Sequence, residues 1–271
     1  MMTRYNWLVI AMIISLVMTG FYMNQNLSHF INPLGLVIVV AGTLGALFLS
    51  YPSSDILAAL RVAQNAYTTE PPTTDEIVNT LMDLSVRSRR KGIMALENAE
   101  GQTTVSFLKR ALEMLVDSYS ADELRDILTT EMHYFRERRA HHERLFRHAA
   151  RLAPAFGVAG SVIGLITMIT AINQIDFVMQ NMAIALTSIL YGIIFGSFIF
   201  TPIAENINAK TEKELMMQKL VTDGVIAIQS EQNSHRLAKK LESFLTPAAR
   251  RKTEHSFEEI RERVRKLQSE K

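Results

Sequence analysis

Long apolar stretches alternate with polar segments along this chain of 271 residues. Four of the apolar stretches contain no acidic, basic or histidine side chain, and each is long enough to cross the ~30 Å hydrocarbon core of a bilayer as a helix. Any one of them also fits a helix buried in a soluble core, but four together favour membrane spans. The pattern predicts an all-α membrane protein with four transmembrane helices, over residues 5–23, 31–51, 152–172 and 182–203.

The distribution of Lys and Arg predicts the orientation of these spans. Residues 52–151 hold 14 of the 29 basic residues, residues 205–271 hold another 14, and Arg4 is the remaining one. The short connections 24–30 and 173–181 hold none. Because cytoplasmic loops are enriched in Lys and Arg, we expect both termini and the long central segment in the cytoplasm. The net charge of +2 then reflects topology, and no nucleic-acid partner is expected.

The long polar segments have helical patterning and almost no strand signal. Residues 52–151 are predicted to form a cytoplasmic helical domain between the second and third spans, and residues 204–271 a cytoplasmic helical tail. Ser120 and Glu123 have the spacing of a capping box, and no Pro or Gly follows until Pro154, so one helix is expected to run into the third span. Other helix starts are expected at Ser53 or Ser54, at Thr73 or Thr74 and near Thr104.

The sequence gives no sign of an enzyme or of a secreted protein. The first apolar stretch follows Arg4, as in a signal peptide, but no small-residue cleavage site precedes the second stretch, so the first is expected to remain as an anchor. The absence of cysteine excludes disulfides and thiolate-bound metal. No phosphate-binding loop, nucleophile elbow or zinc-protease motif is present, so neither catalysis nor a cofactor is expected.

A basic run covers residues 136–151, directly before the third apolar stretch. Basic residues near a membrane surface attract anionic lipid by about 1 kcal/mol each, so a juxtamembrane collar on membrane lipid is the favoured interpretation. His141 and His148 share a helix face, but no carboxylate or cysteine completes an obvious ligand set. No metal site is predicted.

Small residues form a continuous stripe along the third predicted span and a shorter one along the fourth. They recur at steps of three and four, the spacing of one helix face, and such a face lets another backbone approach closely. The stripe is expected to contact the fourth span, a neighbouring subunit or a helix of another chain. The predicted packing glycines are Gly157, Gly160, Gly164, Gly192 and Gly196.

Hydroxyl side chains on the same two spans allow a second interpretation. Tight packing without ions would explain the glycines alone. In the sharper hypothesis, Ser161 and Ser188, with Thr167 and Thr187, line an ion path. The ionisable group of that path must then come from another chain, because the four spans contain none.

Four segments resemble a known family. Residues 151–165 (RLAPAFGVAGSVIGL) and 185–192 (ALTSILYG) are similar to the paired third and fourth spans of the MotA/TolQ/ExbB proton-channel superfamily. Residues 89–97 (RRKGIMALE) and 241–247 (LESFLTP) resemble cytoplasmic segments of its flagellar stator branch, the MotA and PomA subunits. The likeness covers nearly the whole chain, and the order of the motifs is more specific than any one of them.

The resemblance implies an ion-conducting flagellar stator subunit in the bacterial inner membrane. Its copies would form a homo-oligomeric ring, a pentamer, around a dimer of a MotB-like protein whose transmembrane Asp moves the ion. The cytoplasmic domains would push the rotor protein FliG, with Arg89, Arg90 and Glu97 at the contact. Motif position further adds Pro154, Tyr191 and Pro202 to the ion path.

The coupling ion and the branch of the family leave alternatives. Sodium-type relatives tend to have Thr at the positions of Ser161 and Ile189, and Ile189 cannot ligate a cation, so protons are expected in preference to sodium. An ExbB/TolQ-type energiser would typically have three spans, and a related defence motor a longer tail. A non-conducting scaffold would stay functional after Ser161→Ala or Pro154→Leu.

Overall fold

The computed structural model describes residues 12, 15, 19, 30–68, 72–96, 106–170, 172–230 and 234–245. Helices joined by short turns make up this part of the chain, and it contains no strand. Apart from three helical residues, the predicted first span 5–23 lies outside the described residues, as do Glu97 and Pro247.

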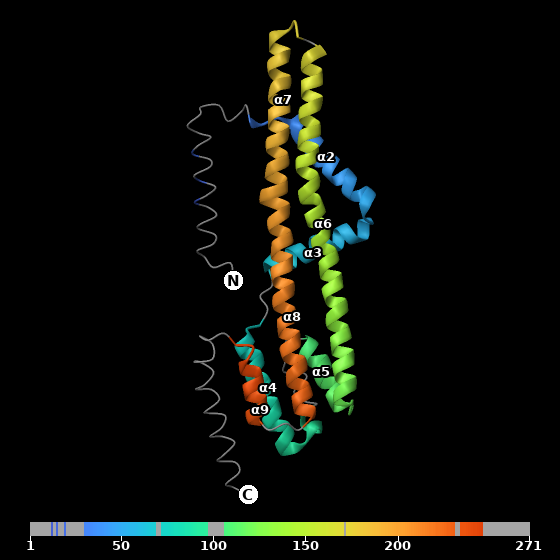
Figure 1. Ribbon diagram of the computed structural model, residues 1–271, viewed down its shortest axis with the longest axis vertical. Helices are drawn as coiled ribbons and strands as arrows, with labels where there is room; N and C mark the ends of the chain where they lie inside the picture. The colour runs from blue at the N-terminus through green and yellow to red at the C-terminus, as the bar shows by residue number, and fades with distance from the viewer. Residues whose placement is uncertain are drawn as a thin grey trace. The chain divides into compact units, whose positions relative to one another are not determined.

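The helices follow one another in the order shown in Figure 1. They are α2 (Pro33–Ser50), α3 (Ser53–Thr68), α4 (Thr74–Lys91), α5 (Ser106–Val116), α6 (Ala121–Thr170), α7 (Ile175–Ile193), the π-helix η3 (Ile194–Phe200), α8 (Thr201–Gln229) and α9 (Ser234–Glu242). Within the described residues, three continuous helical stretches are long and apolar enough to cross a membrane, by length and composition: Pro33–Ser50, Ala121–Thr170 and Ile175–Gln229.

The chain divides into two compact units. Unit 1 comprises Met1–Glu70 and Arg139–Asn208, and unit 2 comprises Pro71–Arg138 and Ala209–Lys271. Both α6 and α8 contribute to each unit.

Helix α6 is the single long helix that the sequence predicts, and it has 50 residues, a length of about 75 Å. Its start is fixed by the predicted capping box: Ser120 N donates to Glu123 Oε2 at 2.9 Å, and Glu123 N donates to Ser120 Oγ at 3.3 Å. Pro154 lies inside the helix and neither begins nor ends it.

Unit 1 is built on the apolar helices. Helix α2 begins where Asn32 Oδ1 accepts a hydrogen bond from Gly35 N at 3.1 Å, with Pro33 in the first turn, and it packs against α7. A small core joins α2 and α3 to α6 and α8 through residues such as Leu47, Ala59 and Phe146. Large side chains on α2, α6 and α7 stay exposed, among them Leu49 and Leu186, as expected for surfaces that face lipid or other subunits.

Helix α7 starts at Ile175, seven residues before the predicted span 182–203, and the charge-free stretch begins directly after Asp176. Asp176 lies in its first turn, where the helix dipole favours a negative charge. The absence of charge therefore marks the apolar part of this helix, and the helix itself extends beyond it.

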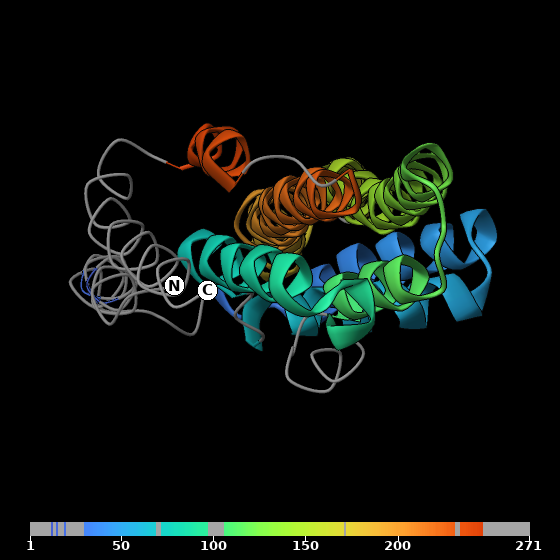
Figure 2. The same cartoon turned by 90° about the horizontal axis from the view of Figure 1, so that it is seen from below.

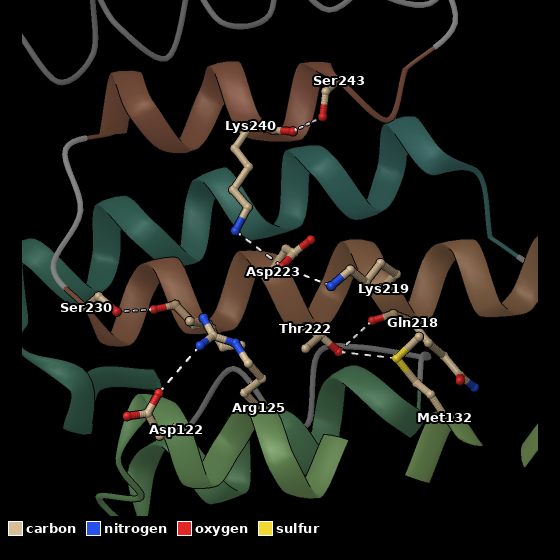
Figure 3. Close-up of polar contacts among 11 residues, drawn as sticks. Asp122, Arg125, Met132, Gln218, Lys219, Thr222, Asp223, Ser230, Lys240 and Ser243 are labelled. Atoms are coloured by element: carbon tan, nitrogen blue, oxygen red, sulfur yellow. Dashed lines mark hydrogen bonds and ion pairs between the residues drawn. The ribbon is translucent and has the colours of Figure 1, made fainter. Parts of the chain in front are cut away.

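Unit 2 is a helical domain with its own apolar core, to which α4, α5, α6, α8 and α9 all contribute. Helix α4 starts with a capping box between Thr73 and Glu76 and packs against α9. Figure 2 shows α4 beside the end of α8, where Gly224 leaves room for Leu81. Figure 3 shows Lys240 of α9 reaching Asp223 of α8, with Nζ 3.3 Å from Oδ1, so that α9 is tied to α8 by charge as well as by apolar contacts.

Candidate functional site

The glycine stripe of α6 contacts α7 of the same chain, backbone against backbone. A side-chain carbon built on Gly157 would lie 2.8 Å from the carbonyl oxygen of Ser188, and one built on Gly164 would lie 2.9 Å from that of Asn181. In the opposite direction, a carbon on Gly192 would lie 2.8 Å from the carbonyl oxygen of Ala153. Each glycine thus turns a Cα–H bond towards a carbonyl of the other helix, the geometry of weak Cα–H···O hydrogen bonds. Because α7 occupies this face, a helix of another chain needs a different one.

Gly196 continues this contact from the π-helical stretch to Pro154. A side-chain carbon on Gly196 would lie 2.7 Å from the carbonyl oxygen of Ala150 and 2.9 Å from ring carbons of Pro154. Pro154 has no N–H, so it cannot donate to the Ala150 carbonyl in the α-helical manner. The Cα–H of Gly196 points to that freed oxygen.

The π-helix itself has an identifiable cause in Pro202, an exposed residue at the start of α8. Pro202 cannot donate to the carbonyl of Phe198, so the regular ladder is interrupted there. Thr201 instead bonds Gly196 O twice, through its backbone N–H and through Oγ1 at 2.8 Å. Helical segments of this kind are frequent at functional sites.

The predicted hydroxyls lie at different depths. Ser188 is 0% exposed and Ser161 9% exposed, whereas Thr167 is half-buried. The hydroxyls of Thr187 and Ser188 each donate to a carbonyl one turn earlier, at 2.7 Å, and Thr167 does the same at 2.8 Å. The donor hydrogens are therefore used within the helices, and the oxygen lone pairs remain as acceptors.

Helix α2 supplies residues to this site that the sequence analysis does not assign. A side-chain carbon on Gly35 would lie 2.8 Å from Ser188 Oγ, and one on Gly42 would overlap the ring of Phe156. Thr43, 2% exposed, has no hydrogen-bond partner for Oγ1 within the described residues. The signal that points to them is the seven-residue spacing of Gly35 and Gly42, which places both on one helix face.

Tyr191 connects α7 to the start of α2. Its hydroxyl donates to the carbonyl oxygen of Phe30 at 2.5 Å and accepts from the backbone N–H of Asn32 at 2.8 Å. The side chain is thus used to hold two helices together, whatever further role it has.

The predicted rotor-contact segment ends α4 in unit 2. Its exposed last turn consists of Arg89, Arg90 and Lys91, at the end of a helix where the helix dipole stabilises positive charge. Gly92, with φ of 79°, stops the helix in a backbone conformation that suits glycine. Leu96, which is fully buried, packs the following turn into the core of unit 2 and so fixes the position of the cationic last turn of α4.

The two histidines considered for metal binding lie beside Tyr51. The rings of His141 and His148 each contact the Tyr51 ring edge-on, with centroids 5.9 and 5.8 Å away. Nε2 of His141 also lies 3.1 Å from Oδ2 of Asp55, so this histidine joins α6 to α3. Across the described ranges, no three His, Cys, Asp or Glu side chains come together as a metal-binding group.

These features define a class: helical membrane proteins whose apolar helices contact one another through glycine. Comparison with known proteins is more specific. A model of the MotA/TolQ/ExbB proton channel family matches residues 99–219. Motility protein A of Treponema phagedenis is 30% identical over 240 residues, which cover 89% of this chain and 93% of that protein. The chain belongs to the MotA/TolQ/ExbB proton channel family, on its motility protein A side.

Solved structures agree with this assignment. The flagellar MotAB stator complex from Bacillus subtilis superposes with a TM-score of 0.81 at 27% identity, covering 90% of this chain and 97% of that chain. The structure of C. jejuni MotAB gives 0.83 at 21% identity, covering 91% and 97%, and supports the fold alone.

Proposed function

We propose that this chain is the ion-conducting stator subunit of a bacterial flagellar motor. It would cross the inner membrane four times, over the predicted spans 5–23, 31–51, 152–172 and 182–203, with both termini in the cytoplasm. One observation carries this proposal: the chain belongs to a proton-channel family, yet its four apolar stretches contain no acidic, basic or histidine side chain. A proton relay through a bilayer uses ionisable side chains such as Asp, Glu or His, so we infer that a second protein completes the conducting unit.

The missing group would come from a MotB-like subunit with a transmembrane Asp. The solved relative from Bacillus subtilis, 27% identical, is a MotAB stator complex, which supports this type of partner and an oligomeric assembly. We propose a homo-oligomeric ring, a pentamer, around two copies of the partner. Since the glycine face of α6 is filled by α7, the partner helices would lie against the exposed apolar faces instead.

Within this assembly the ion path would follow α6 and α7 through Pro154, Ser161, Thr167, Thr187, Ser188, Tyr191 and Pro202. Ser188 lies where α2, α6 and α7 meet, next to Gly35 and Gly160. Its hydroxyl donates within its own helix, so an approaching proton carrier would meet the oxygen as an acceptor.

We propose protons as the coupling ion. A sodium site needs several oxygen ligands around the ion, and Ile189, whose Cα would lie 3.3 Å from a carbon built on Gly157, offers none at the position where sodium-type relatives tend to have Thr. Motility should therefore stop when a proton uncoupler is added at constant sodium. Motility that depends on sodium alone would refute this choice.

Torque would pass to FliG through the cationic last turn of α4. Arg89 and Arg90 are exposed on this turn, and Glu97 follows in the sequence. Reversing the charges with Arg89→Glu and Arg90→Glu should reduce motility without reducing the amount of protein in the membrane. The matched control is Arg125→Glu, an exposed charge elsewhere in unit 2.

The decisive experiment restores motility in a strain that lacks its own stator genes. Expression of this chain together with its MotB-like partner should restore swimming, and the same pair with the partner's transmembrane Asp changed to Asn should not. If the Asn form restores swimming, the partner's transmembrane Asp does not supply the ionisable group of the ion path. Failure of the intact pair, with both proteins present in the membrane, would exclude the stator function in that motor.

A further inference from the structure

A partly open pocket of about 690 Å³ lies in unit 1 and is lined by basic side chains. Arg144, Arg147, His148 and Arg151 lie on its α6 side, at steps of three and four residues, so they share one helix face. The pocket is also lined by Tyr51, directly after α2, and by Thr201, at the start of α8. Three arginines therefore line one concave surface.

The charges in this pocket are only partly compensated. Arg147 is held by two carboxylates: Nε lies 2.6 Å from Glu143 Oε1, and Nη2 lies 3.0 Å from Glu205 Oε1. These contacts raise the pKa of Arg147. Arg144 and Arg151 make no ion pair with any of the described residues. Two free guanidinium groups thus flank a third one that is fixed in position.

The position of the pocket along the chain indicates its depth in a membrane. Tyr51 directly follows α2, Arg151 directly precedes the apolar stretch 152–172, and Thr201 lies near the end of the stretch 182–203. Three apolar stretches therefore end at the same pocket. This is the level at which lipid phosphates lie, and Tyr is enriched there.

We propose that this pocket binds the phosphodiester headgroup of an anionic phospholipid. The free guanidinium groups of Arg144 and Arg151 would donate paired hydrogen bonds to the phosphate oxygens, for which a planar guanidinium is well suited. Thr201 does not donate, because its hydroxyl hydrogen is already given to Gly196 O at 2.8 Å. The acyl chains would follow the exposed apolar surface that begins above Arg151, where Val158 and Val162 face outward.

This site differs from a diffuse basic collar in a way that can be measured. Lipid binding by a diffuse collar would depend on how many basic residues are present and not on where they lie. The pocket depends on Arg144 and Arg151, while Arg138 is also exposed but lies about 20 Å below Arg151 along α6 and does not line the pocket. Arg138 therefore provides a matched control for loss of charge.

The proposal rests on the membrane insertion contained in the proposed function, and its test separates the two. The chain is purified with its partner in detergent, and its melting temperature is followed during titration with phosphatidylglycerol, phosphatidylcholine or inorganic phosphate. Phosphatidylglycerol should raise the melting temperature of the wild type and of Arg138→Gln, since a ligand of the folded state stabilises it. In the double variant Arg144→Gln/Arg151→Gln the half-saturating lipid concentration should rise about tenfold or more.

Each alternative has its own outcome. Equal stabilisation of the wild type and the double variant would leave only a diffuse collar and overturn the proposal. Stabilisation by inorganic phosphate to the same extent would assign the pocket to a soluble anion. The variant Arg144→Lys/Arg151→Lys keeps the charge but loses the paired geometry, and it should bind phosphatidylglycerol with intermediate strength. This variant tests the proposal if the double Gln variant does not fold. Resistance of the chain to alkaline extraction from membranes reports insertion separately from lipid binding.

Discussion

Gly157→Ala gives a quantitative test of the close contact between α6 and α7. The added methyl carbon would lie 2.8 Å from the carbonyl oxygen of Ser188, 3.2 Å from Cα of Gly192 and 3.3 Å from Cα of Ile189. All three atoms belong to backbone, so no side chain can turn away. Ordinary van der Waals contacts to a side-chain carbon begin at 3.4 Å, so the two helices would have to separate by roughly 0.6 Å at the Ser188 carbonyl.

Such a separation has a cost that can be bounded. Forced repacking of this kind costs about 1–3 kcal/mol, and the higher helix propensity of Ala returns about 1 kcal/mol, which leaves a net loss of up to about 2 kcal/mol. Gly45→Ala on α2 is the matched control, because no atom of the described chain lies within 4 Å of its built side-chain carbon. It should be neutral or stabilising.

The assay is thermal unfolding of the purified complex in detergent, combined with swimming in soft agar. Gly157→Ala should lower the melting temperature by several degrees, at about 2–4 °C per kcal/mol for a chain of this size, and Gly45→Ala should not. If the two variants melt at the same temperature as the wild type, the backbone contact between α6 and α7 does not have the closeness described above.

Three further predictions concern the polar parts of the chain. Hydrogen bonds from Ser120 lower the pKa of Glu123 below its usual 4.5, so they stabilise the folded state above that pH and lose this effect as the pH falls. Glu123→Gln should therefore have a lower melting temperature than the wild type near neutral pH, and this difference should vanish in acid. Burial is the main cause that lowers the pKa of His142 below 6.5, so the unfolded state takes up the proton first and stability falls as the pH drops below about 6.5; in His142→Gln the melting temperature should depend less on pH between about 7 and 5. Asp223→Asn removes the ion-pair partner of Lys240 in α9 and of Lys219 in α8 itself. The Lys240 pair contributes about 0.5–1 kcal/mol, so the substitution should speed hydrogen exchange in α9 while leaving α5 unchanged.

Much of the fold follows from local signals in the sequence. The start of α6 is encoded by Ser120 and Glu123, and its unbroken course as far as Pro154 by the absence of Pro and Gly between them. Helix α4 is likewise set by Thr73 and by Gly92. Local capping groups act within one turn, so they can be recognised without knowledge of the tertiary structure.

Other features depend on which helices meet, and the sequence does not contain that information in a local form. The spacing of Gly157, Gly160 and Gly164 predicts a close contact but leaves its partner open, and the structure fills this face with α7. The role of Gly35 beside Ser188 is of the same kind. The π-helix η3 was also not predicted, because Pro202 is as compatible with a kink or a helix end as with a changed hydrogen-bond register.

Both prolines lie in unit 1, although 48 positions separate them in the sequence. Pro154 frees a carbonyl in α6, Pro202 frees one in the stretch that includes η3, and Gly196 lies against the first of these. A regular i to i−4 ladder is therefore interrupted in α6 at this contact and in the η3 stretch two residues beyond it, whereas the contacts at Gly157 and Gly164 lie between intact helical turns. Bending needs fewer hydrogen bonds to be broken where the ladder is already open. A change of angle between α6 and α7 is thus expected near Pro154, at the level where the apolar stretches end and charged residues begin.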